Sequence, residues 1–249
     1  MSCNQEPYFG SFMVANVTWS TRTQYMEKSI ELAIKNFNGD VFRVMEIGSW
    51  AGGSAVLWAR VLRQFKVKSC VYCVDSWSPF DESEKDSGVS KETLLRMKKS
   101  FKNDRIYKLF LHNIRTTGYA DIIKSYKGTS DEILPTLRGD SFDVVYIDGS
   151  HIYSQVIKDL KNSDRLVIDG GYICGDDLEM QLHEVNMNSA KERKEQDFVL
   201  DKKTKKLFHP GVTVAVQEFF SGEVSSYEGF WIMQKSGSDW SKVSLNLNI

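Results

Sequence analysis

The feature that most constrains the fold is the alternation of short apolar runs with segments of helical periodicity. Apolar runs predict strands at 41–48, 70–77, 108–114, 142–150, 166–177 and 229–235. Helical spacing of apolar residues predicts helices at 25–37, 54–65, 90–103 and 211–220, a short helix at 129–137, and one that begins near 153. Continuous apolar runs are typical of strands buried on both faces. This order predicts an α/β fold with a doubly wound, mostly parallel sheet and helices on both faces.

The sequence favours a single domain over residues 1–249, since no repeat or proline-rich linker interrupts it. Residues 1–40 form an N-terminal extension and helix, and the charged stretch 183–208 is expected to be an inserted loop or lid. A net charge of -1 does not favour nucleic acid or an anionic membrane as a partner. No apolar stretch reaches the roughly 20 residues of a membrane span, and no secretory signal is visible. Homo-oligomers, formed through the N-terminal segment or residues 236–249, stay possible.

The four cysteines could suggest a metal or redox site, because Cys70 and Cys73 form a C-x-x-C pair. However, the pair lies in a predicted strand, where residues three apart point to opposite faces. No second C-x-x-C is present to complete four ligands. The cysteines are therefore expected to be reduced, which favours a cytoplasmic location.

A glycine-rich turn follows the first predicted strand, in the segment Glu46 to Ser54. A strand, a glycine turn and a helix in this order are typical of nucleotide-binding sites. Dinucleotide-binding proteins would have glycine where this chain has Trp50, whose bulk would block a pyrophosphate. The second predicted strand ends at Asp75, where a carboxylate can accept hydrogen bonds from ribose hydroxyls. Adenosine with an amino-acid tail therefore fits better than a nicotinamide dinucleotide.

Acidic residues follow the next two predicted strands, at Asp148 and at Asp176 and Asp177. If these strands are neighbours, their ends lie about 5 Å apart, and the carboxylates can converge. A divalent cation that prefers oxygen ligands would relieve their repulsion, and Mg²⁺ is the simplest candidate. Such a cation can orient a substrate hydroxyl and lower its pKa. His151, three residues after Asp148, can act as the general base.

The segment E-x-G-x-x-x-G-x-S, followed by the acid after the second strand, resembles the cofactor site of class I S-adenosylmethionine-dependent methyltransferases. The resemblance implies a Rossmann-like methyltransferase sheet. It also implies contacts of the methionine end with Glu46, Gly48, Gly52 and Ser54, of the ribose with Asp75, and of the adenine with Ser130.

The segment D-G-x-H-x-Y-x-x-V-x-x-D at 148–159, with the later G-D-D and H-P-G-V, resembles metal-dependent small-molecule O-methyltransferases, in particular the macrocin O-methyltransferase and cephalosporin-biosynthesis group. The resemblance implies metal ligands at Asp148, Asp176 and Asp177 and a base at His151. It also implies a small-molecule hydroxyl, such as that of a sugar or polyol, as the acceptor. Members often have Glu-Asp after the fifth strand, so Asp176 is one methylene shorter than their pattern.

Other functions stay open on the sequence alone. The aspartates could cap helices or turns, which would leave a metal-independent methyltransferase. The chain could also be a non-catalytic module that binds an adenosyl ligand. His209 could contact the substrate or lie in an ordinary loop, and Trp77 could flank the adenine or pack in the core.

Overall fold

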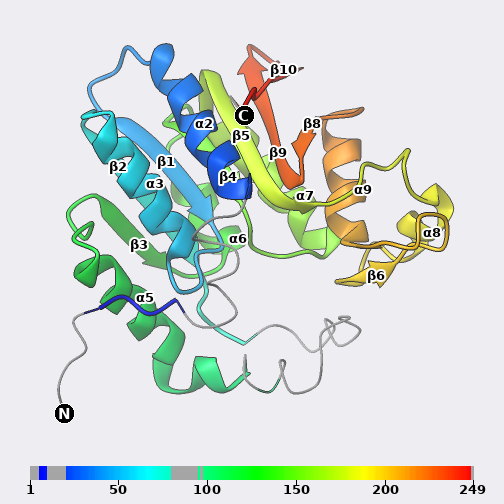
Figure 1. Ribbon diagram of the computed structural model, residues 1–249, viewed down its shortest axis with the longest axis horizontal. Helices are drawn as coiled ribbons and strands as arrows, with labels where there is room; N and C mark the ends of the chain where they lie inside the picture. The colour runs from blue at the N-terminus through cyan, green and yellow to red at the C-terminus, as the bar shows by residue number, and fades with distance from the viewer. Residues whose placement is uncertain (1–5, 10–20, 80–94, 96–97, 248–249) are drawn as a thin grey trace.

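The computed structural model describes residues 6–9, 21–79, 95 and 98–247. It forms a mixed sheet covered by helices on both faces (Figure 1). The helices are α2 (Thr21–Lys35), α3 (Gly53–Gln64), α5 (Arg105–Thr116), α6 (Ser130–Ile133), α7 (Tyr153–Leu166), α8 (Met187–Glu192) and α9 (Pro210–Phe219). Short 3-10 helices lie at Lys102–Asp104 and Leu134–Thr136. The main-sheet strands are β1 (Phe42–Ile47), β2 (Ser69–Asp75), β3 (Ile123–Lys127), β4 (Phe142–Ile147), β5 (Val167–Leu178), β8 (Ser225–Tyr227), β9 (Gly229–Ser236) and β10 (Asp239–Lys242).

The strand order is β10-β9-β5-β4-β1-β2-β3, with β8 paired to β9. β1 to β5 are parallel, and β9 runs antiparallel beside β5. The order reverses between β1 and β4, which is where ligands bind in doubly wound sheets, beyond the carboxyl ends of the strands. The expected fold class is therefore confirmed.

Two apolar layers cover the two faces of the sheet. Side chains of α2, α3 and α5 pack on one face, where Trp58 and Phe110 are fully buried. Side chains of α7 and α9 pack on the other, with Leu160 and Ala215 at the centre. The central strand β4 is buried at every position, as its continuous apolar run predicts.

One predicted strand is wrong. Residues 108–114 belong to the helix α5, and the third strand of the sheet is β3, which the sequence analysis did not find. Ile106, Phe110, Asn113 and Ile114 are the buried residues of α5, and their spacing is that of one helix face. The apolar run 108–114 is short, and periodicity over so few residues does not separate a buried strand from a helix. Half of the helix expected at 90–103 lies outside the described residues, and residues 98–101 are helical.

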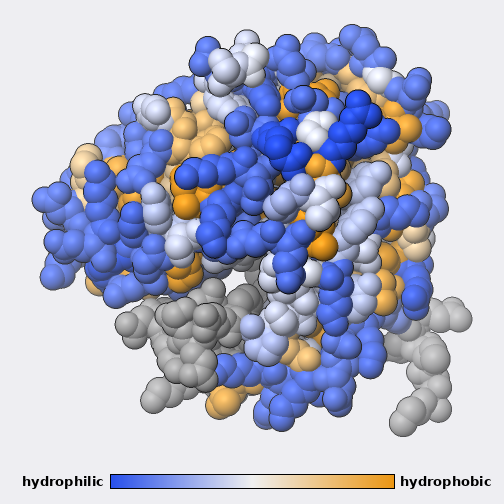
Figure 2. Space-filling view, turned by 180° about the vertical axis from the view of Figure 1, so that it is seen from behind, coloured by the Kyte–Doolittle hydropathy of each residue, from blue (hydrophilic) through white to orange (hydrophobic). Residues whose placement is uncertain are grey.

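The insert, residues 183–208, contains regular secondary structure and is not an open loop. It contains α8 and a two-stranded hairpin of β6 (Val199–Leu200) and β7 (Leu207–Phe208). Its own small core includes Val199 and Phe208 and packs on Val214 of α9. Figure 1 shows the insert beside α9, projecting from the body of the molecule. Figure 2 shows the molecule from behind, and the surface seen there is mostly hydrophilic. Among the described residues no helix is long and apolar enough to cross a membrane.

Candidate active site

The turn between β1 and α3 requires glycine at its first position. Gly48 has a φ of 86°, and a Cβ there would lie 2.1 Å from the backbone oxygen of Asp148. Gly52, the N-cap of α3, also has a φ of 86°. Residues that carry a Cβ are strained in this left-handed region of φ, and glycine is not. The close approach at Gly48 places the glycine turn directly beside the end of β4 and its aspartate.

Asp75 organises this turn from the end of β2. Its Oδ2 accepts hydrogen bonds from the backbone N–H groups of Ser49 (2.9 Å) and Trp50 (2.8 Å). Its Oδ1 accepts one from Trp77 N at 2.6 Å. An ionised carboxylate offers about four acceptor positions, so Asp75 keeps capacity for a further donor. Trp77 itself is 2% exposed and packs on Tyr107, which places its ring in the core.

Glu46 is fully buried at the end of β1. Its Oε2 accepts a hydrogen bond from Ser49 Oγ at 2.6 Å, while Oε1 has no partner within the described part of the chain. Burial raises the pKa of Glu46 to about 7, and the hydroxyls of Ser49 and Ser54 lower it in part. A buried polar atom without a partner is costly and is satisfied when a ligand supplies a donor.

Ser130 begins α6 and faces α7. Its Oγ accepts a hydrogen bond from Gln155 Nε2 (3.1 Å), and the same amide group contacts Asp159 at 3.1 Å. Asp159 is 1% exposed, and burial raises its pKa to about 6. Asp159 is the last residue of the motif at 148–159, although no role was predicted for it, and Gln155 was not singled out because it fits the polar pattern of an ordinary helix.

The three predicted metal ligands do converge. Asp148, Asp176 and Asp177 offer carboxylate oxygens that lie within 4.8 Å of one another. Strands β4 and β5 pair in parallel with Ile147 opposite Gly175, so both strand ends reach the same edge.

A β-bulge explains why two consecutive residues of β5 join this cluster. Alternate residues of a regular strand point to opposite faces. Between Gly175 and Leu178 the pairing with β9 shifts by one residue, and Asp177 has a φ of 64°. A bulge re-aims side chains in this way. We therefore attribute the convergence of Asp176 and Asp177 to the bulge.

An arginine from α2 also enters the acidic cluster. The guanidinium of Arg22 forms an ion pair with Asp176, and both side chains are largely buried. Burial raises the pKa of Asp148 to about 6, and Arg22 lowers it in part. Tyr146 Oη donates a hydrogen bond to Asp148 Oδ2 at 3.0 Å. Arg22 thus offsets one negative charge of the three. The sequence, which indicated only an extension and a helix over residues 1–40, did not predict this contact.

His151 lies between two carboxylates. Its Nε2 is 3.0 Å from Asp177 Oδ2, and its Nδ1 is 2.5 Å from Asp197 Oδ1. Burial lowers the pKa of His151, but the two carboxylates outweigh burial and raise it well above the usual value. Burial raises the pKa of Asp177, and His151 outweighs it and holds that pKa well below its usual range. The two carboxylates therefore favour the protonated form of His151, and the ring must release a proton before it can accept one.

His209 stands next to His151, with the ring centroids 4.3 Å apart. His209 is the N-cap of α9, and its Nδ1 is 2.8 Å from Glu179 Oε1. Gly211 allows this approach, because a Cβ there would lie 2.1 Å from the backbone oxygen of His151. Asp197, which the sequence analysis treated as one charge among many in the insert, and Glu179 complete the cluster.

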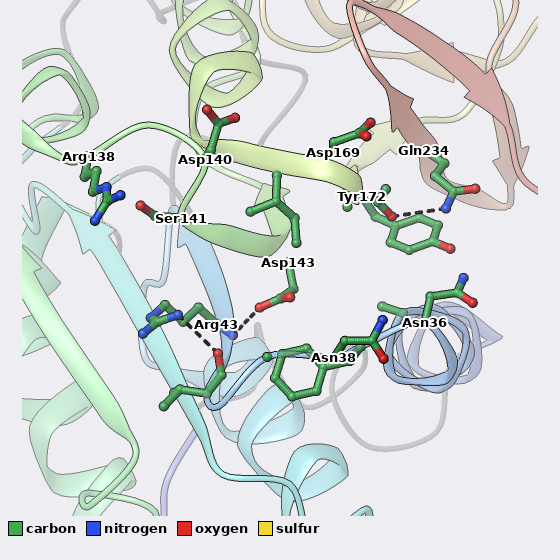
Figure 3. A pocket seen from close by; sticks show the side chains of 17 residues that line it. Asn36, Asn38, Arg43, Arg138, Asp140, Ser141, Asp143, Asp169, Tyr172 and Gln234 are labelled. Atoms are coloured by element: carbon green, nitrogen blue, oxygen red, sulfur yellow. Dashed lines mark hydrogen bonds between the residues drawn. The ribbon is translucent and has the colours of Figure 1, made fainter.

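A polar hollow of about 770 Å³ lies at the other edge of the sheet, where β1, β4 and β5 begin. In Figure 3 Asp143 points into it and accepts a hydrogen bond from the backbone of Arg43. Burial raises the pKa of Asp143. None of the predicted site residues lines this hollow, so we place the active site at the carboxyl edge.

Comparisons with known proteins show the family and the fold of the chain. Residues 45–178, more than half of the chain, match a family model described as a methyltransferase domain. A comparison with curated proteins finds no match.

Solved structures show the same fold. The O-methyltransferase NovP is 20% identical, with a TM-score of 0.60 over 86% of this chain and 79% of NovP. A putative caffeoyl-CoA O-methyltransferase from Staphylococcus aureus is 14% identical, with a TM-score of 0.52 over 90% of this chain and 88% of that one. Cofactor-bound Rv0187 from MTB is 16% identical, with a TM-score of 0.50 over 87% of this chain and 81% of that one.

The matched residues run from β1 to the end of β5, so they contain the glycine turn, Asp75 and the three converging aspartates. The chain therefore belongs to the methyltransferase-domain family and is an S-adenosylmethionine-dependent methyltransferase.

Proposed function

We propose that the chain methylates a hydroxyl group of a small molecule, with a divalent cation, Mg²⁺, held by Asp148, Asp176 and Asp177. The observation that carries this proposal is the contact between Gly48 and the backbone of Asp148, which joins the turn for the methyl donor to the acidic cluster. The names of NovP and of the caffeoyl-CoA enzyme indicate O-methylation in proteins of this fold. A sugar or polyol acceptor is our inference from the resemblance to the macrocin group.

The residues of the turn suit S-adenosylmethionine. Oε1 of Glu46 is buried and has no partner among the residues that the structure describes, and it would accept a hydrogen bond from the methionine end. Gly48, Gly52 and Ser54 would line the same end, because all three belong to the turn between β1 and α3 or to the first residues of α3. Asp75 would accept ribose hydroxyls beside its three backbone partners. Ser130 would lie near the adenine.

The donor set of the acidic cluster suits Mg²⁺, which prefers carboxylate oxygen and retains water. When bound, such a cation lowers the pKa of a coordinated hydroxyl. If Asp177 turned towards the cation, the pKa of His151 would fall, because Asp177 is its partner at Nε2. The ring would then release a proton to solvent, and the neutral imidazole would accept the hydroxyl proton. The substrate oxygen then forms a bond to the methyl carbon as the carbon–sulfur bond breaks, which leaves S-adenosylhomocysteine. His209, beside His151, would contact the acceptor.

A metal-independent methyltransferase is the second candidate, and one contact favours it. Arg22 already pairs with Asp176, so the protein can offset part of the cluster's charge with its own guanidinium. In this alternative Arg22 and the aspartates would orient the acceptor by hydrogen bonds alone. The two candidates differ in whether activity requires a cation.

Calorimetry with S-adenosylhomocysteine and with Mg²⁺ tests the proposal on wild type and on Asp148→Asn. Asp121→Asn is the matched control, because that aspartate is 65% exposed and pairs with Arg63 far from the cluster. We expect both variants to bind S-adenosylhomocysteine and Asp148→Asn alone to lose Mg²⁺ binding. Equal Mg²⁺ binding in all three proteins would refute the metal site. Absence of nucleoside binding in wild type would refute the cofactor assignment.

Formation of S-adenosylhomocysteine from S-adenosylmethionine, followed with a panel of sugars and polyols, identifies the acceptor class. Activity that survives EDTA would favour the metal-independent candidate. Activity with hydroxyl acceptors that EDTA abolishes and Mg²⁺ restores would support the proposed mechanism.

A further inference from the structure

His151, Asp197 and His209 form a second group of ligands beside the acidic cluster. One donor atom from each lies within 4.8 Å of the other two. Asp197 Oδ1 stands between the rings, 2.5 Å from His151 Nδ1 and 3.7 Å from His209 Nε2. Three separate parts of the chain supply these residues: the turn after β4, the insert and the start of α9.

The other nitrogen of each ring faces a carboxylate. His151 Nε2 is 3.0 Å from Asp177, and His209 Nδ1 is 2.8 Å from Glu179. Histidines that bind metals nearly always donate their second N–H to such a group, which fixes the ring and its tautomer. Phe198 packs on His209 with ring centroids 4.5 Å apart and covers this side of the pair.

The donor set differs in kind from that of the three aspartates. Two imidazole nitrogens and one carboxylate oxygen suit a borderline cation such as Zn²⁺ or Co²⁺, whereas oxygen alone suits Mg²⁺. Ligand atoms around tetrahedral Zn²⁺ lie about 3.3 Å apart, given bonds of about 2 Å. The separations of 2.5 and 3.7 Å fall on either side of that spacing, and the two ring nitrogens lie within 4.8 Å of each other. Adjustments of up to about 1.5 Å would therefore form the site.

We propose that His151, Asp197 and His209 bind a divalent cation of borderline hardness, Zn²⁺ in the cell. This site is separate from Asp148 and Asp176. Three protein ligands leave an open position for water or substrate. A cation on His151 Nδ1 would prevent that ring from accepting a proton. Occupancy would therefore oppose methyl transfer, a consequence that rests on the proposed function.

The test uses Co²⁺ as the probe, because its visible absorption reports nitrogen ligation and low coordination number. The full chain is titrated with Co²⁺ in the presence of saturating Mg²⁺. The variants are Asp197→Asn, His209→Ala and Glu179→Gln, and the control is His183→Ala, a histidine that is 56% exposed and pairs with Glu223.

We expect one Co²⁺ per chain with visible bands in wild type and in His183→Ala. Asp197→Asn and His209→Ala should lose the bands. Glu179→Gln, which removes only the partner of a ligand, should weaken Co²⁺ binding about 10–100-fold. Binding of S-adenosylhomocysteine, measured on the same samples, shows that each variant is folded.

The proposal is wrong if the visible bands are absent in wild type, or if they persist unchanged in both Asp197→Asn and His209→Ala. These outcomes are distinct from failure of the proposed function. That failure would appear as loss of S-adenosylhomocysteine binding in wild type and would leave the cobalt result standing.

Discussion

Replacement of Gly48 by alanine tests the contact that joins the two halves of the site. The left-handed φ of 86° costs an alanine about 1–2 kcal/mol. The added Cβ would also lie 2.1 Å from the oxygen of Asp148, about 1 Å inside ordinary contact, so β1 and β4 must separate at their ends. Overpacking of this kind costs about 1–3 kcal/mol, which gives a total of about 2–5 kcal/mol.

Gly118→Ala is the matched control, since Gly118 has a φ of 77° with no atom within 4 Å of an added Cβ. It bears the backbone strain without the overlap, so it should lose about 1–2 kcal/mol at most. Urea unfolding measures both losses, and calorimetry with S-adenosylhomocysteine measures binding. Binding should weaken in Gly48→Ala alone. Equal destabilisation of the two variants, or unchanged binding in Gly48→Ala, would refute the reasoning.

Three further predictions follow from the site and the insert. The folded state holds the Glu46 proton more tightly than the unfolded chain, so wild type should lose stability as pH rises from 4.5 to about 7. Glu46→Gln should lack that loss, and identical pH profiles in urea unfolding would contradict the burial argument. Arg22→Met should raise the affinity of the aspartates for Mn²⁺, because it removes the guanidinium that competes with the metal ion. Electron paramagnetic resonance measures this affinity, and an unchanged value would show that Arg22 does not compete. Phe208→Ala, which empties part of the insert's core, should cost about 3–5 kcal/mol locally and speed hydrogen exchange over 183–208. Equal acceleration over the whole chain would contradict an independent insert core.

The sheet could largely be predicted from the sequence because its central strands are buried on both faces. β4 is buried at every position and β1 at five of its six, and such largely apolar segments leave few alternatives. The edge strand β3 escaped prediction because Ile123 is its only buried residue. The run at 108–114 was misassigned because one apolar helix face, read over seven residues, resembles a buried strand.

The site could be predicted only in part, for a related reason. Turn glycines and strand-end aspartates are visible because strand ends are easy to locate. Arg22, Asp197 and Glu179 are not, because they reach the site through the packing of α2 and the insert. The bulge at Asp176 and Asp177 depends on pairing with β9, which lies more than 50 residues away in the sequence.

The bulge also has a consequence for how far this protein can be stabilised. Asp177 has a φ of 64°, a conformation that favours glycine by about 1 kcal/mol or more over other residues. The same residue contacts His151 and belongs to the acidic cluster, so a glycine that would relax the backbone would remove a carboxylate that we propose as a metal ligand. Thermostability and reactivity therefore make opposite demands on position 177, and engineering for heat resistance should leave it unchanged.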